Sequence, residues 1–352
     1  MPFKPKYTIT NKIVNNLTEI AAGREIIEQA KLIPKWELKL RKEARIRNAH
    51  SSTSIEGNNL TLGQVADLAE NKDITAMAKD KDEVLNYLKA LDSIPEYAAK
   101  KTIDVKLFLK IHETLTIGTL RYQKDCGVLR DRAVFVGKRI FDGTRFKEVA
   151  EYIPPKTKDV PRLVSEFLDW LNSNKIREVS PVILAGIVHY EIARIHPFID
   201  GNGRTARLMA TLVLYKSGFD HRRFFALDDF YDENRQAYYD ALKTVQASKG
   251  DITKWLEYFT EGVLFSIDKV KDFIEKIGLT PKIEEGERIE LTQKQIKILE
   301  RIKEKGKVSN KDLRDMFGIT RQAILKEISK LIDAKLIELV GKGRNAYYKI
   351  SD

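Results

Sequence analysis

The chain has 352 residues, of which 43% are hydrophobic and 32% charged, and a formal net charge of +11. This length predicts one large and one small domain with an ordinary hydrophobic core. Its one cysteine, Cys126, excludes a disulfide framework or a cysteine-based zinc cluster. No apolar run approaches the roughly 20 residues of a membrane span, and the N-terminus lacks the apolar core of a signal peptide. We therefore expect a soluble cytoplasmic protein that does not associate with a membrane.

Most of the chain before residue 280 has the apolar spacing of amphipathic helices. A polar, glycine-containing joint is expected at residues 51–59. A short β-hairpin is expected from segments 127–130, 133–137 and 139–141. The predicted helices are residues 11–30, 34–48, 62–71, 82–94, 105–115, 159–174, 180–195, 204–216, 232–247 and 251–276.

A charged linker at residues 282–290 has no apolar periodicity and marks a domain boundary. The segments that follow are three helices, at residues 292–305, 309–317 and 320–334, and a hairpin at 336–340 and 346–350. Ser309 is suited to cap the second helix. This order is typical of a winged helix-turn-helix domain. We therefore predict an N-terminal helical region at 1–100, a core at 101–280 and a winged helix at 287–352.

Positive charge is concentrated near the C-terminus. Residues 286–352 hold 16 Lys and Arg against 10 Asp and Glu, which is over half of the net charge of the chain. The excess indicates an acidic partner for the small domain. The alternative is a lysine-rich surface that is simply solvated.

Residues 196–207, with the sequence HPFIDGNGRTAR, are the most informative segment. Pro197 should end the preceding helix near His196, because proline disfavours helical backbone at the residue before it. Gly201 and Gly203 permit a tight turn into the next helix. A helix N-terminus after such a turn presents free N–H groups and the positive end of the helix dipole. The segment therefore predicts a phosphate site.

The side chains of this segment add the chemistry of nucleotidyl transfer. Arg204 and Arg207 lie three residues apart and share one helix face. His196 can exchange a proton near neutral pH. The Asp200 carboxylate is a hard ligand of the kind that Mg²⁺ prefers. A base, a metal ligand, an anion site and two arginines thus fall within twelve residues.

The segment resembles the Fic family motif His-x-Phe-x-(Asp/Glu)-Gly-Asn-Gly-Arg-x-x-Arg and matches all eight fixed positions. The resemblance covers roughly residues 20–268. It implies a mainly α fold: a Fic-type helical core with a short β-hairpin flap, here followed by the winged helix-turn-helix domain. The implied activity is that of a protein adenylyltransferase. Such an enzyme moves AMP from ATP to a Ser, Thr or Tyr hydroxyl of a target protein and uses Mg²⁺.

The resemblance also implies the roles of individual residues. His196 would be the general base, Asp200 would hold Mg²⁺ against the α- and β-phosphates, and Phe198 would anchor the loop in the core. The other histidines, at positions 50, 112, 189 and 221, have no metal-ligand spacing and are interpreted as structural. The residues expected to bind the nucleotide are Glu56, His196, Gly201, Asn202, Gly203, Arg204, Thr205, Ala206, Arg207, Tyr238 and Tyr239.

A second match lies upstream. Ser52 to Gly57 fit the family's inhibitory pattern, (Ser/Thr)-x-x-x-Glu-(Gly/Asn), in which the glutamate pairs with the second arginine of the motif. The inhibitory residues would be Ser52, Glu56 and Gly57, with Glu56 engaging Arg207. The alternative is a capped turn with no regulatory role.

The expected hairpin resembles the flap of the family, at which a target segment adds as an extra strand. Val134, Phe135 and Val136 are the residues expected to bind the target. The alternative is a plain surface hairpin.

Two further functions are consistent with the sequence. One is a DNA-binding regulator whose Fic domain senses nucleotide or modifies itself, and the other is a Fic enzyme that transfers another nucleotide group or removes AMP. Residues available for DNA are Arg321, Gln322 and Lys326 on the recognition helix and Lys342 and Arg344 on the wing. Winged helices also serve as protein-interaction modules. The sequence leaves open a homodimer, the target protein and the signal that releases Glu56.

Overall fold

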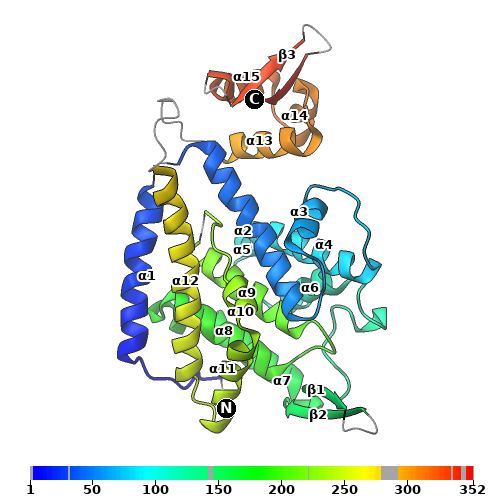
Figure 1. Cartoon of the computed structure of the whole chain (residues 1–352), viewed down its shortest axis with the longest axis vertical. Helices are drawn as coiled ribbons and strands as arrows, with labels where there is room; N and C mark the ends of the chain where they lie inside the picture. The colour runs from blue at the N-terminus through cyan, green and yellow to red at the C-terminus, as the bar shows by residue number, and fades with distance from the viewer. Residues whose placement is uncertain are drawn as a thin grey trace. The chain divides into compact units, whose positions relative to one another are not determined.

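The structure is a computed structural model that describes residues 3–30, 32–141, 146–220, 222–278, 292–333, 336–341 and 346–351. The described residues are mainly helical and contain two two-stranded antiparallel sheets. They divide into two units (Figure 1). The first comprises the residues up to Glu28 and Arg41–Phe273, and the second comprises Gln29–Leu40 and the residues from Ile274 onward.

The elements follow one another along the chain in this order: α1 (Asn11–Gln29), α2 (Pro34–Ile55), α3 (Leu62–Ala69), α4 (Ala78–Asp92), α5 (Ile94–Ala99), α6 (Val105–Thr116), η1 (Gln123–Asp125), β1 (Val136–Phe141), β2 (Phe146–Tyr152), η2 (Thr157–Asp159), α7 (Val160–Leu171), η3 (Asn174–Glu178), α8 (Pro181–Ile195), α9 (Asn202–Lys216), α10 (Asp228–Glu233), α11 (Arg235–Ala247), α12 (Thr253–Gly278), α13 (Gln293–Lys305), α14 (Asn310–Phe317), α15 (Arg321–Asp333), β3 (Ile337–Val340) and β4 (Tyr347–Ile350).

Every predicted helix is present, α5 was not predicted, and the largest boundary differences are at α2, α4 and α10. The joint predicted from residue 51 onward begins five residues too early, because α2 continues to Ile55. Its polar side chains are satisfied within the fold: the Thr53 hydroxyl donates to the Ala49 carbonyl one turn earlier. The helix predicted at 232–247 is two helices, α10 and α11. They are separated at Asn234, whose side chain accepts the N–H of Ala237 and so caps α11.

The predicted hairpin exists but lies later in the chain. Strand β1 begins at Val136 and pairs with β2, which was not predicted, while residues 127–130 form no strand. The backbone N–H groups of this earlier segment bind elsewhere: that of Gly127 donates to the His112 ring, and that of Arg130 to the Pro197 carbonyl. Residues 127–130 are therefore fixed to α6 and to the 196–207 loop, and not to a sheet.

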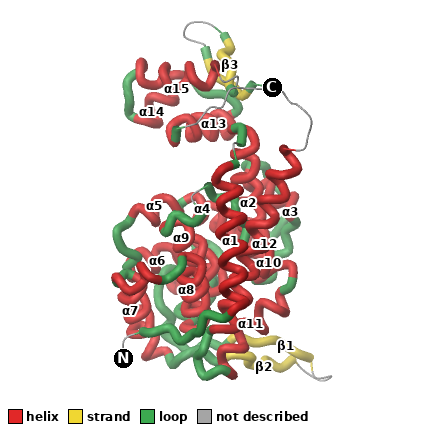
Figure 2. Tube along the Cα trace, turned by 90° about the vertical axis from the view of Figure 1, so that its left-hand side faces the viewer, coloured by secondary structure: helices red, strands yellow, loops and turns green. Residues whose placement is uncertain are grey.

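Helix α8 lies at the centre of the first unit. Twelve of its fifteen residues are buried, and a Cβ at Gly186 would come within 3.1 Å of the Phe259 ring on α12. Helix α9 packs along α8, and α1 lies beside α12 (Figures 1 and 2), where Lys12 pairs with Glu261 at 2.6 Å. The turn between α8 and α9, which carries residues 196–207, is thus held by a rigid, buried helix pair.

The second unit has the predicted winged helix-turn-helix order of elements. Helices α13, α14 and α15 enclose an apolar core that includes Ile298, Leu313 and Ile324. Ser309 caps α14 as predicted, with Asp312 completing a capping box. The predicted linker at 282–290 and the wing residues Lys342 and Arg344 lie outside the described residues. Across the part of the chain that the structure describes, no helix has the length and apolar content needed to span a membrane.

Candidate functional site

The imidazole of His196 is held at the end of α8. The helix stops at Ile195, as the position before Pro197 predicted, and His196 takes a left-handed conformation with φ of +51°. Its Nδ1 lies 3.3 Å from the Ala193 carbonyl oxygen. Since a carbonyl only accepts, Nδ1 carries the proton and Nε2 is left as the basic atom. Burial lowers the pKa of His196, so the ring is neutral near pH 7 and able to take up a proton.

The N-terminus of α9 presents free backbone N–H groups. Its first helical hydrogen bond runs from Thr205 to the carbonyl of Gly201, so the N–H groups of residues 202–204 precede the helical ladder. Gly201 has φ of +78°, and a Cβ there would lie 2.7 Å from Thr116 Cγ2. Only glycine fits this turn. The helix begins at Asn202, two residues earlier than predicted.

The Asn202 side chain closes the turn. Its Oδ1 accepts the N–H of Phe198 at 2.9 Å and its Nδ2 donates to the Phe198 carbonyl at 3.0 Å. Two other predicted nucleotide contacts, Thr205 and Ala206, are fully buried, and the Thr205 hydroxyl donates to the Gly201 carbonyl. The Asn202 and Thr205 side chains thus stabilise the turn, which leaves the backbone N–H groups of the helix N-terminus as the groups available to a ligand.

His112 on α6 connects the turn to neighbouring segments. Its ring stacks on Phe198 with centroids 3.6 Å apart, which confirms that Phe198 anchors the loop in the core. Nδ1 accepts the N–H of Gly127 at 3.0 Å, so Nε2 carries the proton and donates to the Asp200 carbonyl at 2.9 Å. Burial lowers the pKa of His112 to about 4. A neutral imidazole of fixed tautomer therefore joins three segments of the site.

The buried guanidinium of Arg130 connects the turn to the segment after the hairpin. It donates to the His196 carbonyl at 2.8 Å, to the Pro155 carbonyl at 2.5 Å and to the Thr157 hydroxyl at 3.0 Å. The backbone of His196 and the base of the hairpin therefore share one cation.

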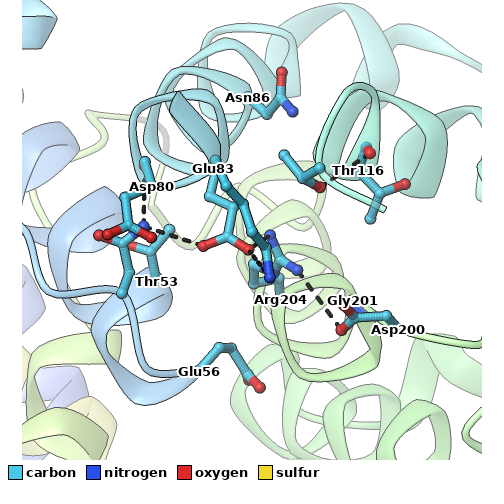
Figure 3. Close-up of polar contacts among 12 residues, drawn as sticks. Thr53, Glu56, Asp80, Glu83, Asn86, Thr116, Asp200, Gly201 and Arg204 are labelled. Carbon is cyan, nitrogen blue, oxygen red and sulfur yellow. Dashed lines mark hydrogen bonds and ion pairs between the residues drawn. The ribbon is translucent and has the colours of Figure 1, made fainter. Parts of the chain in front are cut away.

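Arg204 lies between two carboxylates (Figure 3). Its Nη2 is 3.8 Å from Asp200 Oδ1 and its Nη1 is 3.5 Å from Glu83 Oε1 on α4. The guanidinium is buried, and its Nε and Nη1 have no hydrogen-bond partner among the described residues. Buried donors without acceptors are rare in folded proteins, and since Nη1 already faces the Glu83 carboxylate, Nε is the donor left without any acceptor in the described part of the chain.

Arg207 is bound by the segment that precedes Gly57. Its Nη2 lies 2.7 Å from Glu56 Oε1 and donates to the Ser52 carbonyl at 2.8 Å, while its Nε donates to the Ser52 hydroxyl at 2.7 Å. The Arg207 side chain is fully buried, whereas that of Glu56 is 33% exposed. The structure therefore brings together Ser52, Glu56 and Arg207, which are more than 150 residues apart.

The predicted adenine contacts, Tyr238 and Tyr239, lie near Arg207 and the end of α2. The hydroxyl of Tyr238, a buried side chain, lies 2.9 Å from His189 Nε2 and 3.5 Å from Arg207 Nη1. The hydroxyl of Tyr239 donates to the Ile55 carbonyl at 3.3 Å. Both tyrosines thus support the arginine and the end of α2, and their contact with a nucleotide stays a prediction.

The predicted flap residues lie at the start of the hairpin. Val136 opens β1, while Val134 and Phe135 precede it, with Phe135 exposed.

Asp200 has a carboxylate that is 53% exposed and accepts the N–H of Gly201. No group of three or more metal-ligating side chains gathers within the described ranges. Mg²⁺ at Asp200 would therefore take most of its oxygen ligands from phosphate and water, as this ion commonly does.

Four residues of this site were not among the predicted site residues: His112, Arg130, Glu83 and Asp228, a buried aspartate 3.9 Å from Arg207 Nε. They come from helices and loops far from residues 196–207, and no spacing pattern connects them to it. Of the four, only His112 was considered from the sequence, and the structural role expected for it is confirmed.

Comparisons with known proteins agree with this geometry. The profile of the Fic/DOC family matches residues 102–214, and a winged helix-turn-helix DNA-binding profile matches residues 291–338. The chain is 32% identical over 225 residues to the protein adenylyltransferase Fic of Drosophila erecta, covering 63% of this chain and 41% of that protein. It is 29% identical over 232 residues to that of Nematostella vectensis, covering 64% of this chain and 49% of that protein. The chain thus spans less than half the length of these relatives.

A solved structure resembles nearly the whole chain. The crystal structure of a Fic family protein from Desulfovibrio desulfuricans covers 99% of this chain and 98% of its own, with a TM-score of 0.64 and 25% identity. The Fic-1 protein of C. elegans shares the fold over 75% of this chain, with a TM-score of 0.61 and 24% identity. The fold is that of a Fic domain, and the 196–207 turn lies within the residues that the family profile matches. This chain therefore contains a Fic domain and, after it, a winged helix-turn-helix domain.

Proposed function

We propose that this protein is an adenylyltransferase that moves AMP from ATP to a Ser, Thr or Tyr hydroxyl of a target protein, and that Glu56 restrains it. The relatives named protein adenylyltransferase support the activity in general. The restraint, the target hydroxyl and Mg²⁺ are inferred from the residues of this chain.

The observation that carries the proposal is the position of the Glu56 carboxylate. It pairs with Arg207 and lies against Gly203 at the N-terminus of α9, where free N–H groups favour an anion. A carboxylate in this position competes with a phosphate group for the same cation. ATP would bind productively only after Glu56 has moved away, since one guanidinium face cannot serve both anions.

The remaining residues fit the transfer of AMP. His196 Nε2 would take the proton from the target hydroxyl, and the half-buried, neutral ring is in the protonation state that a general base needs. The Arg204 guanidinium, whose Nε has no hydrogen-bond partner among the described residues, would stabilise the charge on the phosphates, and Arg207 would bind the γ-phosphate. Asp200 would hold Mg²⁺, which supplies charge neutralisation at the phosphates when bound.

The hairpin would present the target. Backbone pairing along β1, beginning near Val136, binds an extended segment without requiring a particular side-chain sequence. The hydroxyl would then be directed to His196, because Arg130 connects the segment after the hairpin to the His196 backbone.

The test is transfer of labelled AMP by purified protein in the presence of ATP and Mg²⁺. Glu56→Gly should increase the transfer, and His196→Ala should abolish it in either background. Glu19→Gly, which makes the same substitution on the exposed face of α1, is the matched control and should leave transfer at the wild-type level. Equal transfer by wild type and Glu56→Gly would refute the restraint, and persistent transfer by His196→Ala would refute the base.

A second candidate function, DNA binding, concerns the winged helix-turn-helix domain. It is favoured by the matching DNA-binding profile and by the exposure of Gln322 and Lys326 on α15, the helix predicted to enter the major groove. Of the predicted recognition residues, the Arg321 side chain lies outside the described set.

A further inference from the structure

The guanidinium of Arg207 is surrounded by polar groups from three helices. Ser52 and Glu56 approach it from the end of α2, and Tyr238 approaches from α11. Asp228, the first residue of α10, contributes a second carboxylate whose Oδ2 lies 3.9 Å from Arg207 Nε. One buried cation thus faces two carboxylates of different kinds.

The two carboxylates differ in how firmly they are held. Glu56 follows the last turn of α2 and is 33% exposed, so it can leave toward solvent. The Asp228 side chain is 2% exposed, and its Oδ2 accepts the Tyr87 hydroxyl at 2.9 Å. Tyr87 is itself completely buried in α4. Asp228 is therefore part of the fixed interior, whereas Glu56 is replaceable.

Departure of Glu56 would leave a buried cation in need of a counter-charge. Removing one partner of a buried ion pair is strongly destabilising, because the remaining charge has lost both water and its partner. Arg207 would retain Asp228 in that state. We propose that Asp228 is the resident counter-ion of Arg207 and acts as a positioning residue, which keeps the guanidinium in place between the departure of Glu56 and the arrival of the γ-phosphate. The inference rests on the proposed function for its second half, the γ-phosphate contact.

The surroundings of Asp228 support its pairing with Arg207. Burial raises the pKa of Asp228 to about 6, and Arg207 is the largest influence opposing that rise. The other groups that act on this carboxyl are Tyr87, Ser52 and the neighbouring Asp229. Asp229 is engaged elsewhere, since it pairs with Arg47 and accepts the Ser51 hydroxyl. At about pH 8 Asp228 is ionised and Arg207 is the cation that it faces.

A double-mutant cycle on thermal stability tests the first half without any nucleotide. Unfolding temperatures are measured at about pH 8 for wild type, Glu56→Gly, Asp228→Asn and the double variant. Asp228→Asn should lower the unfolding temperature by about 5 °C more in the Glu56→Gly background than in wild type, because only there does Arg207 lose its last carboxylate. An equal decrease in unfolding temperature in both backgrounds would overturn the proposal.

Two further variants keep the cycle interpretable. Asp220→Asn is the matched control, because Asp220 is also a buried aspartate but accepts the backbone N–H of Phe224. This substitution should lower the unfolding temperature by the same amount in both backgrounds. If Asp228→Asn does not fold, Tyr87→Phe replaces it. This change removes one hydrogen bond from Asp228 and should produce the same background dependence with a smaller amplitude.

The preference for ATP over ADP tests positioning, because only the γ-phosphate distinguishes the two ligands. In the Glu56→Gly background, Asp228→Asn should reduce the ratio of ATP to ADP affinity several-fold, toward that of Arg207→Ala, while ADP affinity is unchanged. A merely structural role would weaken both ligands equally, and that result or a raised preference for ATP would overturn positioning. If Glu56→Gly binds neither nucleotide while the stability cycle is non-additive, the proposed function fails and the counter-ion assignment stands.

Discussion

The carboxylate of Glu56 lies against the backbone of Gly203. A Cβ at position 203 would overlap Glu56 Oε1 and would come within 3.1 Å of Arg207 Nη1. The absence of a side chain at this point thus creates the space that the carboxylate fills. This space is bounded by the N-terminus of α9 and by Arg207, which are the two features that attract a phosphate.

Gly203→Ala should separate loss of the restraint from gain of activity. The added methyl group displaces Glu56 from Arg207, as Glu56→Gly does, but it also occupies the proposed phosphate position. We therefore expect AMP transfer by Gly203→Ala to stay at or below the wild-type level, whereas Glu56→Gly exceeds it. Transfer of labelled AMP measures both. Activation by Gly203→Ala comparable to that of Glu56→Gly would show that phosphate does not bind at this glycine.

The stability of the first unit should depend on pH through His112. Its pKa is about 4 in the folded chain, against about 6.5 for an exposed histidine. Below pH 6.5 the unfolded chain binds a proton at this histidine that the folded chain does not bind. The free energy of unfolding is therefore highest above pH 6.5, and it decreases by up to about 3 kcal/mol as the pH falls to 4. His112→Gln should remove this component. The measurement is the free energy of unfolding by urea at several pH values between 4 and 7.

His112→Phe provides the control for that experiment. It preserves an aromatic ring to stack on Phe198 but loses the hydrogen bonds to Gly127 and Asp200. Its stability should be lower at every pH, with the same flattened dependence as His112→Gln. A pH dependence identical to wild type in both variants would assign the acid sensitivity to other groups.

The central site was predictable because its main features are consecutive in the chain. Pro197, Gly201 and Gly203 act through local backbone preferences, so the end of α8, the tight turn and the start of α9 follow from their order. The helices were predictable for a similar reason, since apolar periodicity is a local property.

Long-range contacts set the limits of sequence prediction. The polar end of α2 was expected to be a joint, because serine and threonine favour turns over helix interiors. Its Ser52 is instead buried against Arg207, and this tertiary contact overrides the local preference. The misplaced hairpin has the same origin, since Gly127 is bound to His112 on α6 and Arg130 to Pro197 of the 196–207 turn. Asp228 and Glu83 face the two arginines only because the chain folds back on itself.

Arg130→Lys should weaken catalysis without removing any group that contacts the nucleotide. A lysine ammonium lacks the planar fork that reaches His196, Pro155 and Thr157 at once. In the Glu56→Gly background we expect kcat to fall by about tenfold, which corresponds to about 1.4 kcal/mol in the barrier. Steady-state AMP transfer gives kcat and KM separately. Arg162→Lys, which alters an exposed pair with Glu166, is the control, and an unchanged kcat in Arg130→Lys would remove Arg130 from the mechanism.

Binding of the winged helix to DNA should be strongly salt-dependent. Contacts between lysine and phosphate release counterions from DNA, so affinity falls as salt rises, and each lost contact lowers the slope of log affinity against log salt by about 1. Lys326→Ala should show this reduced slope in a gel-shift titration, because Lys326 is exposed on α15. Lys12→Ala on α1, where the lysine pairs with Glu261, should retain the wild-type slope. An affinity that does not change with salt would exclude DNA as the partner and favour a protein-interaction role for this domain.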